Sequence, residues 1–252
     1  MRPMRLWPLE WVSVIAGLLL WQVAAMLAAS RLFPGPVAVA GELVELVLSG
    51  PLLADLGRTL IRVGIGFVVA MLLGTLLGLL IGRNRVLDRL VAPWLVLGLN
   101  LPALVTAIAL YIWLGLTEFA LILAVVVNKL PLVTATLREG VRSFAPAYDE
   151  LARAYRLPLV GRLRLIALPQ LAPFLLAAAR TGLSLLWKIV LVFEVLGADG
   201  GVGFRINVMF QFFDITGILA MTASFVAVVV AFDRLVLVPL ERGLDRWRTD
   251  PA

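Results

Sequence analysis

Residues 150–169 read ELARAYRLPLVGRLRLIALP, and the rest of the chain is organised around this segment. It is charged, whereas long apolar segments make up most of the chain on either side of it. Arg142 lies just upstream, and the stretch itself contains Arg153, Arg156, Arg162 and Arg164. A charged segment between two long apolar segments is typical of a loop that emerges from a membrane and meets water or a partner protein.

Two short helices are predicted in this region. After Pro146, charged residues recur every third position on one helical face, namely Glu150, Arg153 and Arg156. Pro158 is expected to end this helix, because the residue before a proline is disfavoured in the helical region. A second short amphipathic piece is predicted over 160–167. We call residues 143–169 the elbow and predict that it is a docking surface between two membrane spans.

The composition of the chain indicates a membrane protein. Of its 252 residues, 62% are hydrophobic and only 15% are charged, which leaves too little polar surface for a soluble domain of this size. The net charge of +6 comes from short basic clusters between apolar segments, without the aromatic interleaving of a nucleic-acid-binding face. We therefore expect a lipid bilayer around the protein and no nucleic acid partner.

The missing residue types argue against catalysis. The chain has no cysteine and no histidine, so disulfides, thiolate metal sites and imidazole bases are unavailable. It has two lysines, Lys129 and Lys188, and neither is in the Gly-Lys-Ser/Thr sequence of a nucleotide-binding loop. We expect no catalytic residue, no metal and no cofactor. If transport is driven by ATP, the ATPase is a separate subunit.

The apolar segments predict an all-α, polytopic membrane protein with one transmembrane domain over 1–252. Segments of about 18 or more apolar residues are long enough to cross the hydrocarbon core. The first is expected to be a retained span rather than a cleaved signal peptide. An amphipathic helix lying on the membrane surface is predicted around 39–47. The third span is expected to be kinked at Pro93 and Pro102. The six predicted spans are about 11–29, 63–82, 90–117, 119–137, 172–196 and 215–232.

The second span carries a ridge of small residues. They recur at every fourth position as Gly66, Ala70, Gly74, Gly78 and Gly82. Small residues at this spacing let another helix approach closely, although glycine is also common in membrane helices generally. The pattern predicts tight packing of this span against another span of the same chain.

The distribution of basic residues predicts the orientation. If the N-terminus is cytoplasmic, fifteen of the 22 lysines and arginines lie in cytoplasmic segments, four lie outside or at the outer border, and three lie within spans. Basic residues concentrate on the cytoplasmic side of membrane proteins. We therefore expect both termini and the elbow to be cytoplasmic.

Four polar residues within or near the ends of the spans are candidates for a solute pathway: Asn128, Lys129, Lys188 and Glu194. A lysine inside a span costs about 2.5–3.5 kcal/mol on insertion scales and needs compensation. Each lysine could extend to the membrane interface, or Lys188 could pair with Glu194. The interpretation we favour is that one or both face a water-filled pathway and attract an anionic solute.

The elbow also resembles the EAA signature of bacterial ABC importer permeases, which runs E-A-A, a glycine about four residues on, and a closing I-x-L-P. The matching residues are Glu150, Ala152, Ile166, Leu168 and Pro169. The chain departs from the signature at Leu151, which replaces an alanine, and at Arg156, which stands where the glycine is expected; Pro158 can supply the break instead. The resemblance implies the type I permease fold and a coupling loop in a cleft of an ATPase subunit. It assigns ATPase coupling to Glu150, Ala152, Arg153, Arg156, Gly161, Ile166, Leu168 and Pro169.

Later residues resemble the nitrate, sulfonate and taurine subgroup of these permeases: Trp187, Glu194, Gly197 and the glycine-rich 200–203. This resemblance implies import of a small, anionic solute through the bacterial inner membrane. It also implies three partners, which are ATP-binding cassette subunits, a soluble substrate-binding protein and a second copy of the chain. We expect the glycine-rich segment to be a flexible re-entry loop on the outer side.

Two other classes remain as alternatives. A secondary transporter driven by an ion gradient usually holds carboxylates or histidines within its spans, and Glu194 is the only acidic candidate here. An intramembrane enzyme or assembly factor is disfavoured, because histidine, cysteine and paired intramembrane carboxylates are absent from the sequence. Co-purification of an ATPase in fixed ratio would distinguish the permease from both.

Overall fold

The computed structural model describes residues 7–48 and 50–239, and every regular element in these ranges is helical. Five helical segments are long and apolar enough to cross a membrane, and a bent helix pair makes a sixth crossing if it is counted as one span. The predicted all-α fold class with six spans is confirmed on that count.

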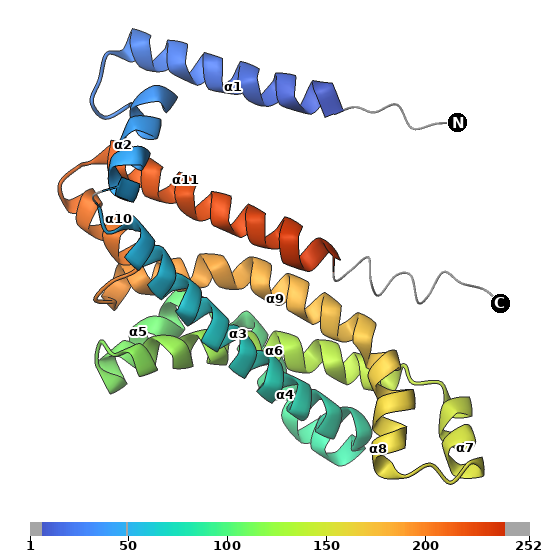
Figure 1. Ribbon diagram of the computed structural model, residues 1–252. Coiled ribbons are helices and arrows are strands. Elements are labelled where there is room, and N and C mark those ends of the chain that lie inside the picture. Colours follow the sequence, from blue (N-terminus) through green and yellow to red (C-terminus); the bar gives the residue numbers. More distant parts are fainter. Residues whose placement is uncertain (1–6, 49, 240–252) are drawn as a thin grey trace.

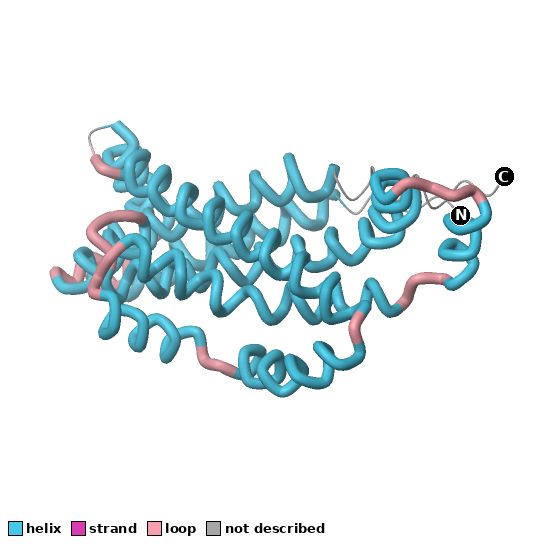
Figure 2. Tube along the Cα trace, turned by 90° about the horizontal axis from the view of Figure 1, so that it is seen from below, coloured by secondary structure: helices cyan, strands magenta, loops and turns pink. Residues whose placement is uncertain are grey.

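The crossings run alternately between the two ends of an elongated bundle (Figures 1 and 2). They are α1 (Trp7–Ala28), α3 (Leu52–Arg83), the pair α4 (Arg85–Asn100) and α5 (Ala103–Leu114), α6 (Glu118–Arg142), α9 (Leu168–Gly197) and α11 (Ile215–Phe232). The shorter helices are α2 (Pro36–Leu48), α7 (Pro146–Ala154), α8 (Leu159–Arg162) and α10 (Val202–Gln211), with π-helical turns at Leu163–Ala167 and Asp233–Leu237. We call the end that carries α7 and α8 the elbow end, and the end that carries α2 and α10 the far end (Figure 1).

The core of the bundle is the contact between α3 and α6, and the glycine ridge of α3 makes it. A Cβ atom built on Gly74 would lie 2.6 Å from the Cβ of Val133 on α6, and one built on Gly78 would lie 2.7 Å from the Cβ of Leu137. Distances this short leave no room for a side chain, so the two backbones approach closely only because the ridge is glycine. The predicted packing of this ridge against another span of the same chain is confirmed.

The third crossing is broken rather than kinked. Helices α4 and α5 meet at an angle of 98°. The break falls at Leu101 and Pro102, whereas α4 remains helical through Pro93. Pro102 sets the break because it has no N–H to donate back into α4 and disfavours a helical conformation at Leu101.

The amphipathic helix predicted near 39–47 is α2, which runs crosswise to the long helices at the far end (Figure 1). Its apolar face buries Val39 and Leu46, with Leu43 packed against the same core. Val47, the last residue of the predicted segment, is exposed. The amphipathic pattern thus reflects contact with the bundle, mainly with α11.

Candidate functional site

The first helix of the elbow, α7, ends in a Schellman motif centred on Arg156. The N–H of Leu157 donates to the carbonyl of Ala152 at 3.0 Å, and the N–H of Arg156 donates to that of Arg153 at 3.1 Å. Arg156 takes the left-handed conformation with φ +47°. The chain therefore turns out of the helix at the position where the family signature has glycine. The expectation that Pro158 replaces this turn is wrong, because Pro158 only follows it.

The two faces of α7 have different environments. Ala152 is 2% exposed and packs inward, whereas Leu151 is 47% exposed. Glu150 and Arg153 are also exposed. The departure from the E-A-A signature at Leu151 thus lies on the outward face, and the matching Ala152 lies on the inward face.

The second half of the elbow is the beginning of a long helix. The apolar helical segment runs without a break from Val160 to Gly197. The N–H of Leu168 donates to the carbonyl of Leu163, five residues back, and Pro169 follows with no N–H to donate. A separate helix ending before Pro169 was predicted, and this is wrong because a π-helical turn accommodates the proline within the helix.

The remaining signature residues divide between the two faces of this segment. Ile166 is buried, whereas Leu168 and Pro169 are exposed. Gly161 is half-buried, and a Cβ atom there would make an ordinary contact of 3.4 Å with the ring of Pro158. Close packing within the chain therefore does not require glycine at position 161.

Polar contacts hold the base of the elbow. Asp88, at the start of α4, accepts hydrogen bonds from Arg138 and Arg142 in the last turns of α6. The side chain of Gln170 accepts from the N–H of Ala145 at 3.3 Å, which ties the start of α7 to α9. The end of α6 is thereby fixed to α4, the start of the elbow is fixed to α9, and two of the arginines counted near the elbow are ion-paired within the chain.

The outer surface of the elbow is apolar and basic. Tyr155 and Val160 are each 73% exposed. The same surface also carries Tyr148, Leu151, Leu163, Leu165 and Leu168 as exposed apolar residues and Arg153, Arg156, Arg162 and Arg164 as exposed arginines. Tyrosine, arginine and leucine side chains gathered outside the core suit a protein interface better than solvent.

The far end contains a buried ionic cluster. Arg62 of α3 donates to Glu194 of α9 at 2.7 Å and to Glu118 of α6 at 2.9 Å. Glu194 is fully buried and also accepts from the hydroxyl of Thr59 at 2.9 Å. The cluster joins three crossings and compensates the charge of Glu194. The alternative in which Lys188 pairs with Glu194 is therefore wrong.

The glycine-rich segment is held by this cluster and is not a flexible loop. The N–H of Gly203 donates to Glu194 at 2.9 Å, that of Gly201 donates to Asp55 at 3.1 Å, and that of Val202 donates to Thr59 at 2.9 Å. Gly201 has φ +104°, which favours glycine. Because carboxylates and a hydroxyl accept from these N–H groups, the segment is anchored to α3.

Asp55 and Thr59 were not predicted as site residues from the sequence. Both lie on the same face of α3 as Arg62, at spacings of four and three residues. This polar face directly precedes an apolar span, and that pattern could have indicated that Asp55 and Thr59 belong to a buried polar cluster. Their partners on α9 and α10 are more than 130 residues away in sequence.

The two lysines differ in environment. Lys129 is 3% exposed on α6, midway between Val125 and Val133, which face the glycine ridge. It therefore lies level with Ala70 inside the contact between α3 and α6. Lys188 on α9 is exposed, and Asn128 is half-buried. The structure does not bring the four predicted pathway residues together.

A bundle of six crossings with an exposed elbow between the fourth and fifth defines a multi-pass membrane protein with a docking surface at one end. The chain belongs to the family of binding-protein-dependent transport system inner membrane components, whose family model matches residues 70–238. It is thus the permease of an ABC importer and not itself an enzyme, since the ATPase of such systems is a separate subunit. The family implies ATPase and binding-protein partners and an inner-membrane location.

Named relatives cover most of the chain. The putative aliphatic sulfonates transport permease SsuC of Bacillus subtilis is 28% identical over 231 residues, 91% of this chain and 83% of that protein. The bicarbonate transport permease CmpB of Synechococcus elongatus is 27% identical, over 93% and 87% of the two chains. The formylaminopyrimidine transport permease ThiX of Halalkalibacterium halodurans is 28% identical, over 81% of each.

Solved structures confirm the type I permease fold. A chain of an amino acid ABC transporter matches with a TM-score of 0.64 at 18% identity, covering 79% of this chain and 97% of that one. A chain of the MetNI methionine transporter matches with a TM-score of 0.61 at 18% identity, covering 79% and 95%. These matches give no support to a secondary transporter.

Proposed function

We propose that the elbow is the surface through which this permease couples to its ATPase subunits. The observation that carries the proposal is the exposed apolar and basic surface of α7 and α8, at one end of the bundle. Glu150 contributes an exposed carboxylate that can meet basic groups on the partner. Ala152 and Ile166 act from the inside, by packing the elbow against the bundle.

The test is charge reversal at Glu150. Glu150→Lys should leave the protein inserted in the membrane but lower the amount of ATPase that co-purifies with it. The matched control is Glu42→Lys on α2 at the far end. Burial, and then the nearby carboxylates of Asp214 and Glu45, raise the pKa of Glu42 above its ordinary value, so a lysine there relieves repulsion. Equal ATPase recovery from both variants would contradict the proposal.

We further propose that both termini and the elbow are cytoplasmic and that the permease works as a homodimer. The basic-residue count supports the orientation, and the described start of α1 and end of α11 lie toward the elbow end (Figure 1). Cross-linking in membranes that yields only a monomer would contradict the homodimer.

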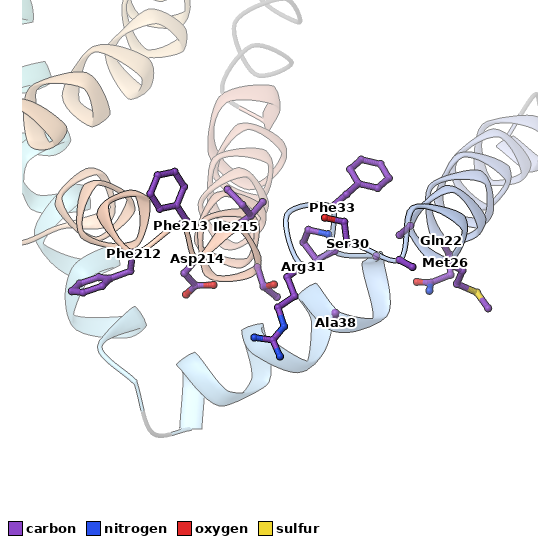
Figure 3. A pocket seen from close by; sticks show the side chains of 15 residues that line it. Gln22, Met26, Ser30, Arg31, Phe33, Ala38, Phe212, Phe213, Asp214 and Ile215 are labelled. Atoms are coloured by element: carbon purple, nitrogen blue, oxygen red, sulfur yellow. The ribbon is translucent and has the colours of Figure 1, made fainter.

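The far end is the proposed side for the binding protein. A cavity of about 650 Å³ opens there between the α1–α2 turn and the α10–α11 turn (Figure 3). Arg31, Phe212, Phe213 and Asp214 are among the residues that line it. Charged and aromatic groups around a hollow give a soluble partner both a shape and a charge pattern to recognise.

The proposed solute is a small anion of the nitrate, sulfonate or taurine type. Two of the three relatives named above are described as permeases for sulfonates and bicarbonate. Of the predicted pathway residues, exposed Lys188 is the one best placed to meet the solute, whereas Lys129 and Glu194 support the surrounding helices. Ligand binding to the cognate soluble binding protein tests the solute class, and a cationic ligand would contradict it.

A further inference from the structure

One face of α9 carries a polar stripe through an otherwise apolar span. Arg180, Ser184 and Lys188 recur every fourth residue and are all exposed on the surface of the chain. The opposite face of the same helix is buried and apolar, with Leu183, Leu186 and Val190 in the core. The stripe therefore points away from the chain's own core, at the depth of the membrane.

This stripe forms one wall of a groove between α9 and α11. The groove has a volume of about 670 Å³. On the α11 side it is lined by Thr222 and, beyond the end of that helix, by Asp233 and Arg234. Its charged lining thus consists of the cations Arg180, Lys188 and Arg234 against one carboxylate, a net charge of +2.

Aromatic contacts keep the groove in shape. The ring of Trp187 meets that of Phe225 edge-on at 6.0 Å and that of Phe232 at 5.8 Å between centroids. Since Trp187 lies on α9 and both phenylalanines lie on α11, these contacts join the two walls. The packing of α9 against α11 thus forms the groove, and its volume is in the range of sites that hold small organic ligands.

Contact with lipid tails is unfavourable for the charged lining of this groove. Charged residues within membrane spans face protein or a water-filled cavity, because exposing them to hydrocarbon is costly. Guanidinium, ammonium and hydroxyl groups together form a donor set for an oxyanion: arginine donates to two oxygens at once, lysine supplies a mobile charge, and Ser184 adds a neutral donor. Thr222 only lines the wall, because its hydroxyl donates to the carbonyl of Ile218 at 2.8 Å.

We propose that this groove is a transient binding site for the oxyanion group, such as a sulfonate, of the transported solute. The proposal rests on the proposed anion-import function and adds Arg180 and Ser184 to Lys188 as the groups that meet the solute. The net positive charge attracts the anion, while the small number of donors and the open groove allow it to leave again.

The absence of cysteine from the chain allows a clean test. Ser184→Cys is introduced in the full permease, co-expressed with its ATPase and placed in zwitterionic lipid nanodiscs. Its reaction with an anionic and a cationic methanethiosulfonate reagent is measured, each rate divided by that of free cysteine. The anionic reagent should react at least about tenfold faster, as expected for a positive cleft. Methanesulfonate should slow that reaction, and Lys188→Met in the same background should weaken the preference, because it lowers the net charge of the lining from +2 to +1.

The control is Leu185→Cys, one residue along α9 and exposed outside this lining, which should show neither the preference nor the protection. Equal rates for the two reagents would overturn the proposal. The proposal would also be overturned if the cysteine of Ser184→Cys reacted with neither reagent and cross-linked to a second copy of the chain. The same holds if phosphatidylglycerol protected this cysteine and methanesulfonate did not. The labelling rates depend neither on transport nor on contact with the ATPase. A negative result would therefore contradict the anion site without contradicting ATPase coupling through the elbow.

Discussion

Arg156 holds a backbone conformation that glycine adopts at lower cost. A left-handed residue with a Cβ atom is strained by about 1–2 kcal/mol relative to the right-handed form, whereas glycine is not. The Schellman bonds of α7 require this conformation at position 156. The arginine side chain at this position is exposed on the surface of the elbow.

A pair of variants at position 156 measures the free-energy cost of the left-handed backbone conformation. Arg156→Gly and Arg156→Ala remove the same charge and side chain, but only glycine relieves the left-handed strain. We expect the glycine variant to be more stable than the alanine variant by about 1 kcal/mol. Chemical denaturation of the purified protein measures the difference. An alanine variant at least as stable as the glycine variant would show that the turn at position 156 is not required.

The Arg62–Glu194 pair makes a second prediction at this scale. Removing one partner of a buried ion pair costs about 3–5 kcal/mol, because the other charge is left uncompensated. Arg62→Met should be the more damaging single change, since it leaves fully buried Glu194 with only Thr59 and the N–H of Gly203. Glu194→Met should cost less, because Arg62 keeps Glu118.

The double variant Arg62→Met/Glu194→Met supplies the control for that comparison. It removes both charges, so its loss of stability should be smaller than the sum of the two single losses by at least about 1 kcal/mol. Strictly additive losses would mean that the two side chains contribute independently and that the pair does not anchor the glycine-rich segment.

At the scale of helices, the contact between α3 and α6 depends on the glycine ridge. Gly74→Leu should force these helices apart and destabilise the protein by more than about 1 kcal/mol. The matched control is Gly64→Leu in the same helix, because a Cβ atom there meets nothing within 4 Å. Thermal unfolding of both variants checks the prediction, and equal unfolding temperatures would refute it.

The sequence predicts helices better than it predicts their breaks and partners. The ridge on α3 was visible because its spacing is local, and apolar length alone indicated the crossings. The continuous α9 was missed because a proline after a π-helical turn need not end a helix. The partners of Glu194 were missed because Thr59 and Arg62 come close only when α3 and α9 pack together.

In the whole molecule, α9 connects the exposed elbow at one end with the buried ionic cluster at the other. Its first turns continue the exposed elbow, and Glu194, 26 residues after Leu168, lies in the buried cluster of the far end. At 1.5 Å per residue these points are about 39 Å apart along one helix. Between them lies the groove proposed to meet the solute. If the elbow moves with its partner, α9 would therefore move as one helix and displace both the groove and the far end.

The orientation of these two ends is the remaining prediction. Tyr155→Cys places a thiol on the elbow and Phe212→Cys places one at the far end, at positions 73% and 79% exposed. With the elbow in the cytoplasm and the permease expressed without its ATPase, a membrane-impermeant maleimide should label only the Phe212→Cys protein in spheroplasts and both proteins after permeabilisation. Leu72→Cys, an exposed position in the middle of α3, controls for lipid shielding and should stay unlabelled in intact membranes. Labelling of Tyr155→Cys in sealed spheroplasts would reverse the orientation. The proposed coupling surface would then face away from any cytoplasmic ATPase, however well its apolar and basic groups suited one.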